Sequence, residues 1–476
     1  MLDGLRPYQS YKDSGLEWLG DVPSHWRVDR ARFLFREVDQ RSQFGIETHL
    51  SMSQRLGLVP SSMVEQRTLV SESYAGGKLC ACGDLVLNRL KAHLGVFARA
   101  RQAGVISPDY TVLRPRKEIA PQYFEELLRS PICRSEFRAR AKGIVEGFWR
   151  LYTDDFYNIR LPFPPLAEQA AIVRFLNHAD RRIRLYIHAK QRLIKLLEEQ
   201  KQAIIHCAAT QGLDPNVRLK PSGVEWLGDV PEHWAVRRLK DVTTPLEQGW
   251  SPQCDAQPAG DGEWGVLKVG CVNKDQFEPN QNKRLPSEQS APPNLQVRDG
   301  DILVSRANTR ELVGLAAVVV EPRERLLLCD KLFRFRARPE SADSWFLVSA
   351  IRSQKSRAQI ESKTNGASDS MQNIGQMVVQ DLVLALPPLA EQHAISSAIR
   401  KQLQNHAIAT STTRRELSFL YEYRTRLIAD VVTGKLDIRA AALPNEVEDV
   451  DPLDDVEALA IDAADEGDET KESDDA

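Results

Sequence analysis

A short segment occurs twice in this chain of 476 residues, and the repeat constrains the fold more than any other feature. Residues 14–26 read SGLEWLGDVPSHW and residues 222–234 read SGVEWLGDVPEHW, at an offset of 208. A second shared motif, PPLAEQ, begins at Pro164 and again at Pro387, at an offset of 223. Two motifs in the same order exclude chance. They indicate that one unit has been used twice, with about 15 residues added inside the second copy.

Weaker similarities fill the interval between the two motifs. GDLVLNR at 83–89 corresponds to GDILVSR at 300–306, and each is an alternating apolar strand after a Gly-Asp turn that predicts a hairpin. YFEELLRS at 123–130 and WFLVSAIRS at 345–353 both predict a short amphipathic helix. Each copy is therefore expected to be a mixed α/β (α+β) domain.

A long helix is predicted after each Pro-Pro pair, because proline suits the first turn of a helix. In the first helix the apolar positions step by four and three, which is the period of a coiled-coil seam. These positions are Ile172, Leu176, Ala179, Ile183, Tyr186, Leu193, Leu197, Ile204 and Cys207, with Lys190 and Gln200 as interruptions. The helix is expected to end near TQGLD at 210–214.

The second helix ends at TGKLD, residues 433–437, still at an offset of 223, so its length matches that of the first helix. Two helices packed along each other would lose their common span if one changed length. Its seam positions are apolar at Ile395, Ile399, Leu420, Tyr423 and Leu427 but polar at Gln402, His406, Thr413 and Glu416. The middle of this helix is expected either to be hydrated or to face a partner protein.

The predicted organisation has a pseudo-twofold duplication, with two long helices forming an antiparallel coiled coil between tandem domains. Its divisions are a first α/β domain at 1–164, a spacer helix at 165–211, a second α/β domain at 212–386, a second spacer helix at 387–440, and a disordered acidic tail at 441–476.

The overall charge of −3 averages over two very different parts. Residues 445–476 contain 15 acidic residues and one lysine, which leaves 62 basic and 51 acidic residues, a net of +11, for residues 1–444. A basic body favours a polyanionic partner, although charge says nothing about sequence specificity. The tail is expected to be a solubilising extension or to screen the body against nonspecific DNA.

Several classes of protein are disfavoured. No apolar stretch approaches the roughly 18 residues of a membrane helix, and the N-terminus lacks a secretion signal, so a cytoplasmic location is expected. The seven scattered cysteines suit free thiols, and the CxC at Cys80 and Cys82 lacks a second ligand pair for zinc.

Catalytic motifs were sought without success. No GxxxxGK[ST] phosphate loop, no Asn/Asp-Pro-Pro-aromatic methyltransferase loop and no glycine-rich turn for S-adenosylmethionine occur. Pro108-Asp109 lacks a matching Glu-x-Lys in its own domain, which disfavours a nuclease site. His25 and His233, beside Trp26 and Trp234, fit packed or capping roles better than catalysis. We expect no catalytic residue, metal or cofactor in this chain.

Polar loops are the best candidates for DNA contacts, because Arg, Lys, Asn and Gln read base edges while basic and hydroxyl groups hold phosphates. For each residue a solvated loop is the competing interpretation. The candidates are Asn88, Arg89, Lys91, His93, Lys142, Trp149 and Arg150 in the first domain, and Ser305, Arg306, Asn308, Thr309, Arg310, Lys363, Asn365, Ser368, Gln372 and Asn373 in the second.

The order of motif, α/β domain, PPLAEQ, long helix, then the same again, resembles the specificity subunit of type I restriction-modification enzymes over roughly residues 10–440. The resemblance implies two target-recognition domains that read the halves of a split, asymmetric sequence in double-stranded DNA. It also implies two modification (methyltransferase) subunits docked on the helices and restriction/translocase subunits that join to cut. S-adenosylmethionine, ATP and Mg²⁺ would then lie on the partners. The acidic tail and the loop at 307–310, where a glycine is usual, depart from the family pattern and leave the second hairpin open.

Two alternatives belong to other classes. A coiled-coil scaffold or inhibitor would bind proteins without reading DNA, and its binding would lack the salt dependence that phosphate contacts impose. A self-contained nuclease would require metal-dependent cleavage by the isolated chain.

Overall fold

The structure is a computed structural model, and it describes residues 5–53, 56–64, 74–143, 149–274, 276–368, 371–439 and 441. The chain forms two compact units. Of the described residues, those in 5–191 and 415–441 form unit 1, and those in 192–414 form unit 2. Each unit contains one recognition domain and about half of each long helix. The expected acidic tail lies outside the described residues, apart from Ala441.

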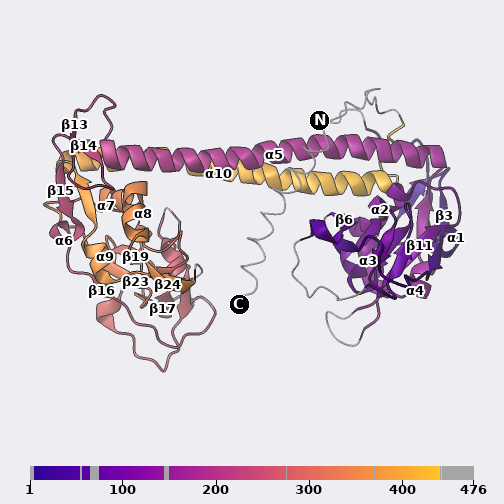
Figure 1. The fold of residues 1–476 in the computed structure, drawn as a ribbon, viewed down its shortest axis with the longest axis horizontal. Coiled ribbons are helices and arrows are strands. Elements are labelled where there is room, and N and C mark those ends of the chain that lie inside the picture. Colours follow the sequence, from indigo (N-terminus) through magenta and orange to yellow (C-terminus); the bar gives the residue numbers. More distant parts are fainter. Residues whose placement is uncertain are drawn as a thin grey trace. The chain divides into compact units, whose positions relative to one another are not determined.

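Unit 1 is built around an antiparallel sheet in the order β4-β11-β8-β9 (Figure 1). Helices α2 and α3 pack on it through a cluster that includes Phe35, Phe97, Phe124 and Phe137. A smaller cluster on the other face joins the sheet to the strand pairs β5-β6 and β10-β7. The strands of this unit are β1 (Tyr11–Asp13), β2 (Asp21–Pro23), β3 (Arg27–Arg30), β4 (Phe35–Val38), β5 (Leu50–Ser53), β6 (Gly57–Pro60), β7 (Lys78–Cys80), β8 (Leu85–Asn88), β9 (Phe97–Arg99), β10 (Gly104–Ile106), β11 (Tyr110–Pro115) and β12 (Arg160–Phe163). Its shorter helices are α1 (Ala31–Leu34), η1 (Ser61–Met63), η2 (Arg89–Leu94), α2 (Pro121–Arg129), α3 (Pro131–Arg140) and α4 (Thr153–Tyr157).

Unit 2 repeats the inner sheet in the order β16-β23-β19-β21 but covers it differently. Its outer layer is a three-stranded sheet, β18-β17-β22, over its own apolar cluster, and a further sheet has the order β20-β25-β24. The strands are β13 (Leu219–Pro221), β14 (Asp229–Pro231), β15 (Ala235–Arg238), β16 (Glu247–Gln248), β17 (Gly265–Leu267), β18 (Asn282–Arg284), β19 (Ile302–Ser305), β20 (Ala307–Asn308), β21 (Ala316–Val318), β22 (Leu326–Leu327), β23 (Leu332–Phe335), β24 (Asn365–Ser368), β25 (Met371–Asn373) and β26 (Val383–Leu386). The shorter helices are α6 (Leu239–Val242), η3 (Val269–Val272), η4 (Pro293–Leu295), α7 (Ser344–Arg352), α8 (Gln354–Glu361) and α9 (Gln376–Gln380).

Both predicted hairpins and both predicted amphipathic helices are confirmed. The Gly-Asp strand β8 pairs antiparallel with β9, and its counterpart β19 pairs with β21. Helices α2 and α7 bury the aromatic side chains that led to their prediction, Phe124 and Phe346. The mixed α/β class is confirmed with them, because each unit packs such helices on an antiparallel sheet.

The two repeated motifs bind each other within each unit. In unit 1 the indole Nε1 of Trp26 donates to Glu168 Oε1 at 3.1 Å, and His25 Nε2 lies 2.7 Å from Glu168 Oε2. Unit 2 reproduces both distances, 3.1 and 2.7 Å, among Trp234, His233 and Glu391. The glutamate of PPLAEQ thus fastens the first turn of each long helix to the tryptophan motif, which explains why the two motifs recur together.

Helix α5 spans Leu166–Gln211 and helix α10 spans Leu389–Val432. Within unit 1 they run antiparallel, because Asp180 pairs with Arg424 whereas Lys190, ten positions later in α5, pairs with Glu416 at 2.6 Å. Two of the polar residues that interrupt the predicted seams, Lys190 and Glu416, therefore form an ion pair.

The predicted seam of α5 is right at its start and wrong further along. Ile172, Leu176, Ala179 and Ile183 are buried, but Tyr186 and Leu193 are exposed, and Cys207 is exposed as well. Beyond Ile183 the buried apolar positions of α5 are instead Ile187, Ile205, Ala208 and Ala209. A straight α-helix drifts by about 20° per heptad relative to a strict 3.5-residue repeat, so the buried stripe moves to neighbouring positions.

Both long helices are largely uncovered in their middle parts. No residue of α5 between 188 and 204 is buried, and Thr413 is the one buried residue of α10 between 400 and 426. Helix α10 ends at Val432, directly before the TGKLD segment expected to end it, because Gly434 adopts a left-handed φ of 80° and terminates the helix. Among the described residues no helix is long and apolar enough to span a membrane.

Candidate nucleic-acid interface

Arg89 and Arg306 occupy equivalent places, directly after β8 and β19. Arg89 Nε donates to the backbone oxygen of Asp109 at 2.7 Å, and Arg306 Nη1 donates to that of Asp330 at 3.2 Å. The backbone oxygen of each arginine also accepts a hydrogen bond from a backbone N–H later in the chain. Leu151 N donates to Arg89 O at 3.1 Å, and Ile374 N donates to Arg306 O at 3.0 Å. Both candidates thus have an internal contact, and the two domains join their loops in the same way.

The remaining candidates around η2 form a cluster of aromatic and basic groups. Asn88 is buried, and its side chain accepts from Leu90 N at 3.1 Å, which caps η2. The rings of His93 and Trp149 meet edge to face at 5.4 Å. Burial, together with the nearby Arg138 guanidinium, lowers the pKa of His93, so this imidazole is poorly suited to hold a phosphate by charge.

Lys142 and Arg150 are brought together by an antiparallel bridge with backbone hydrogen bonds of 2.9 and 2.8 Å. Both side chains are exposed, as is that of Lys91 on η2. Lys142 Nζ pairs with Asp155 Oδ1 at 2.7 Å. The bridge frames a loop whose residues 144–148 lie outside the described residues.

The second domain gathers its candidates into the sheet β20-β25-β24. Asn308 faces Gln372, and Asn373 pairs with both Ala307 and Asn365. Ser368 faces Met371 across the bulged end of the same sheet. Lys142 and Asn365, like Arg150 and Asn373, are separated by the repeat offset of 223, so the two domains place these candidates at equivalent positions.

The other second-domain candidates differ in exposure. Ser305 is fully buried, and its hydroxyl donates to Leu312 O at 2.7 Å, an internal contact. Thr309, Arg310 and Lys363 are exposed, and the backbone N–H of Thr309 donates to the side chain of Asn308. The departure from the family's glycine at 307–310 is thus accommodated by the short strand β20, which ends at Asn308.

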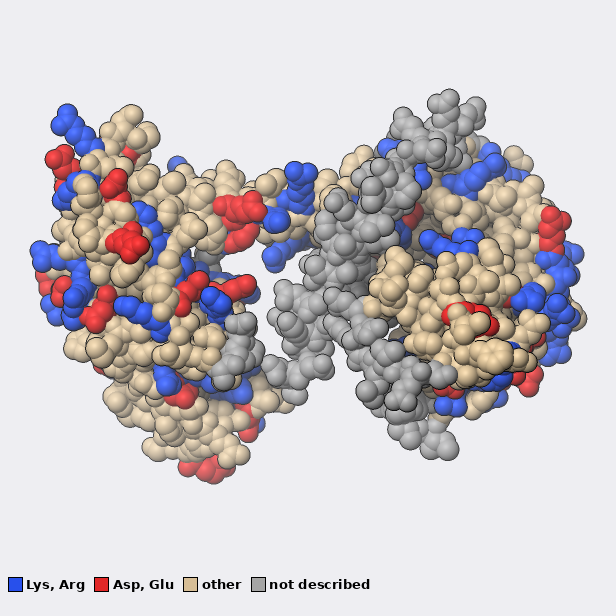
Figure 2. Space-filling view, in the orientation of Figure 1, with Lys and Arg blue, Asp and Glu red and all other residues tan. Residues whose placement is uncertain are grey.

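Charge does not single out one surface. Figure 2 shows Lys and Arg interspersed with Asp and Glu over the face of each unit that it presents. Among the described residues no three His, Cys, Asp or Glu side chains gather as a metal site requires.

Sequence analysis missed the arginine that pairs with the buried aspartate of each Gly-Asp strand. Asp84 accepts two hydrogen bonds of 2.8 Å from Arg114 and a third from Ala81 N. Asp301 has the same role with Arg336 and with Arg298 N, at 2.6 and 2.9 Å. The repeated Gly-Asp pair was a signal for this contact, but the partner arginine follows some 30 residues later and carries no local pattern.

Several known proteins resemble this chain in sequence, although no protein-family model matches it. The EcoEI specificity subunit of a type I restriction enzyme from Escherichia coli is 29% identical over 209 residues, which cover 44% of this chain and 35% of that protein. The chain thus aligns with about a third of the length of this relative. The MjaVIII specificity subunit from Methanocaldococcus jannaschii is 24% identical and the match covers 71% of this chain and 75% of that protein. The EcoKI specificity subunit from Escherichia coli K12 is also 24% identical, over 71% of this chain and 73% of that protein.

The fold has a solved counterpart in a chain from a structure of the assembly and conformational transition of the type I R-M system. The two chains superpose with a TM-score of 0.65 over 86% of this chain and 98% of the other, at 17% sequence identity. The resemblance inferred from the order of the motifs is confirmed, and the scaffold alternative is disfavoured. In both sequence and fold, the chain is thus similar to the specificity subunits of type I restriction enzymes.

Proposed function

We propose that this chain reads a bipartite, asymmetric sequence in double-stranded DNA, one half with each recognition domain, and has no active site of its own. The observation that carries the proposal is the contrast between the copies. The inner sheets share their buried ion pair and loop junction, whereas the outer layers and contact groups differ. Two domains that share an inner scaffold but differ in their surface groups are expected to contact two different DNA sequences.

The long helices set the distance between the half-sites in this proposal. At 1.5 Å per residue, the 46 residues of α5 extend about 69 Å, which is on the order of two DNA turns of about 34 to 36 Å. Each unit contains part of both helices. A change in the length of one helix alone would therefore shift its residues relative to those of the other helix within a unit.

We further propose that the uncovered middle parts of the helices bind two modification subunits. Exposed apolar side chains lie on both helices in unit 1, at Leu185, Tyr186, Phe419 and Tyr421. Unit 2 adds Leu193, Leu196 and Ile408. Exposed aromatic and aliphatic groups on a charged helix are typical of protein interfaces. S-adenosylmethionine would then lie on the modification subunits, ATP and Mg²⁺ on restriction/translocase subunits, and the assembly would methylate adenine and cut DNA in the cytoplasm.

The test is to express the chain with its modification subunit and map adenine methylation by sequencing. We expect a split target, and exchange of one recognition domain for that of a relative should change one half and leave the other half and the spacer intact. Methylation without a split target, or a swap that alters both halves, contradicts the proposal. Binding of the chain to DNA should also weaken steeply with salt.

A further inference from the structure

One cross-strand position in the inner sheet differs in character between the two units. In unit 1 Val38 of β4 faces Val112 of β11, and both pack in the apolar cluster under the outer strands. In unit 2 the corresponding pair is Glu247 of β16 and Arg334 of β23. The correspondence follows from the register, because Val112 faces Val86 and Arg334 faces Leu303, which are equivalent positions of the Gly-Asp strands.

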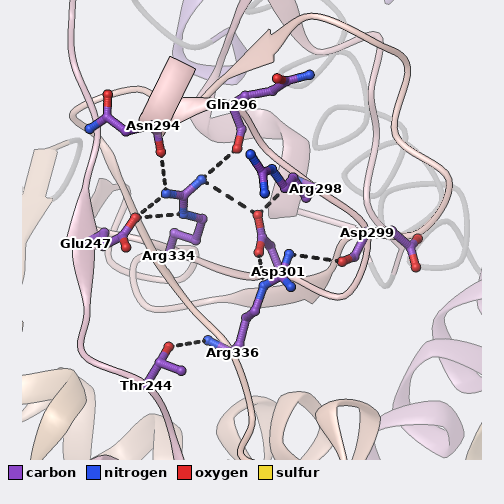
Figure 3. A network of polar contacts seen from close by, with 9 residues as sticks. All are labelled: Thr244, Glu247, Asn294, Gln296, Arg298, Asp299, Asp301, Arg334 and Arg336. Carbon is purple, nitrogen blue, oxygen red and sulfur yellow. Dashed lines mark hydrogen bonds and ion pairs between the residues drawn. The ribbon is translucent and has the colours of Figure 1, made fainter. Parts of the chain in front are cut away.

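The Arg334 side chain is only 11% exposed and its guanidinium is surrounded by acceptors (Figure 3). Its Nε lies 3.1 Å from Glu247 Oε2, and its Nη1 is 3.8 Å from Asp301 Oδ2. The same group donates to the backbone oxygens of Asn294 at 2.8 Å and Gln296 at 2.7 Å. A planar guanidinium can satisfy such a divergent set, whereas a lysine ammonium presents one point charge.

The two carbonyls belong to the edge of the outer sheet. Leu295 O accepts from Leu328 N at 2.9 Å, and Val297 N donates to Leu326 O at 2.8 Å, so this segment runs along β22. Strand β22 is in turn paired with β17, and β17 with β18. Arg334 therefore ties the inner sheet to the outer sheet at its margin. The repeat offset grows from 208 to 217 between the tryptophan motif and the Gly-Asp strand, so this layer has its own length in unit 2.

The outer layer also touches the proposed DNA-contacting sheet. Asn308 Nδ2 of β20 donates to Asn273 Oδ1, which follows η3 of the outer layer, at 2.9 Å. A tilt of the outer layer would therefore displace Asn308, which faces Gln372 across the sheet.

We propose that Arg334 is a positioning residue for the second half-site. It holds the outer layer of unit 2 in register with the inner sheet, and so fixes the surface that discriminates between sequences. The inference rests on the proposed function, because it assigns the residue to one of two half-sites. Unit 1 has no guanidinium at this position: apolar side chains fill it, and its outer strand β7 is linked to β4 by a different contact, between Lys78 Nζ and Glu37 Oε1 at 3.5 Å.

The test compares Arg334→Met and Arg334→Lys with the double variant E247V/R334V, which copies the valine pair of unit 1 and leaves no unpaired carboxylate. Arg237→Met is the matched control, because it removes the same charge from an exposed position of β15 in the same unit. Two measurements are made on each variant. Hydrogen exchange is followed on the isolated full chain, and methylation specificity on the chain assembled with its modification subunit.

In Arg334→Met and the double variant we expect amide exchange of the segment 295–297 and of β17 to rise about tenfold or more, with β8 and β11 of unit 1 unchanged. Discrimination at the second half-site should fall about tenfold, with the first half-site unaffected. Arg334→Lys should lie between these variants and the control. If the clamp variants match Arg237→Met in both measurements, or if both half-sites relax equally, the positioning role is wrong. If the unaltered chain directs methylation to no split target, the proposed function fails, and the exchange data alone decide whether Arg334 clamps the layer.

Discussion

The two recognition domains share their inner contacts almost atom for atom and differ in their outer layers. The tryptophan motif, the buried aspartate with its arginine and the loop junction recur with closely similar distances. The outer layer consists of two strand pairs in unit 1 and of a three-stranded sheet in unit 2. The inner contacts hold each domain together, so their residues tolerate little change. The outer layer has its own small core, and its sequence is constrained mainly by that core and by the proposed contacts with DNA.

The largest effect should come from removing the tryptophan shared by both motifs. Trp26 is fully buried and Trp234 is 1% exposed, so Trp26→Ala and Trp234→Ala should each cost about 3–5 kcal/mol. Hydrogen exchange should show that each variant loosens the unit in which it lies. Equal loosening of both units by either variant would contradict the division into two units.

Replacing the buried aspartate should lower the free energy of unfolding in both units, but by different amounts. Asp84 neutralises Arg114, whereas Asp301 lies against both Arg334 and Arg336. We expect Asp84→Ala to cost about 2–3 kcal/mol and Asp301→Ala slightly more, because the second change removes a carboxylate that lies near two guanidinium groups, although Arg334 keeps Glu247. Urea unfolding measures the difference. A larger loss for Asp84→Ala would show that the extra arginine of unit 2 is compensated elsewhere.

One pH dependence should arise in unit 1 from Glu126. Although part of the Glu126 side chain reaches the surface, burial and the neighbouring Glu125 carboxylate raise its pKa to about 7. Folded unit 1 thus holds a proton that the unfolded chain releases above its ordinary pKa, so stability falls as pH rises from about 4.5 through about 7. The equivalent residue in unit 2 is Ser349, which does not titrate.

The variant that tests this is Glu126→Gln. Near pH 4 it should match the unaltered chain, and at pH 8 its unit 1 should be more stable by about 1–2 kcal/mol, a value discounted for partial exposure. Thermal unfolding at both pH values is the measurement, with Ser349→Gln as the control at the equivalent position. A gain that is independent of pH would show that repulsion by a charged Glu126 is not the cause.

The smallest effect concerns the equivalent positions Lys142 and Asn365. Lys142→Ala should lower the affinity for DNA a few-fold and reduce the slope of log affinity against log salt by about 1, because one phosphate contact is lost. Asn365→Ala should leave that slope unchanged. If neither variant affects DNA binding, the bridge 142–150 and the sheet β20-β25-β24 are not part of the interface.

Much of the scaffold could be predicted because the chain states it twice. The repeat located both domains, both hairpins, the amphipathic helices and the matched long helices. The candidate site was predicted less well, since polar residues in loops give no local sign of their partners. Asn88 and Ser305 carry side chains of the kind that reads bases, yet both point into internal hydrogen bonds.

The sequence by itself determined the duplication, the order of elements and the span of the helices, because motif order and periodicity are local properties of the chain. Only the tertiary structure decided which helix positions are buried and which residues distant in sequence meet. Glu168 meets Trp26 across 142 positions, and Arg334 meets Glu247 across 87. Such pairs depend on strand register and on the drift of the buried stripe along a helix. Both are set by many residues together, so the local sequence around either partner does not reveal the pair.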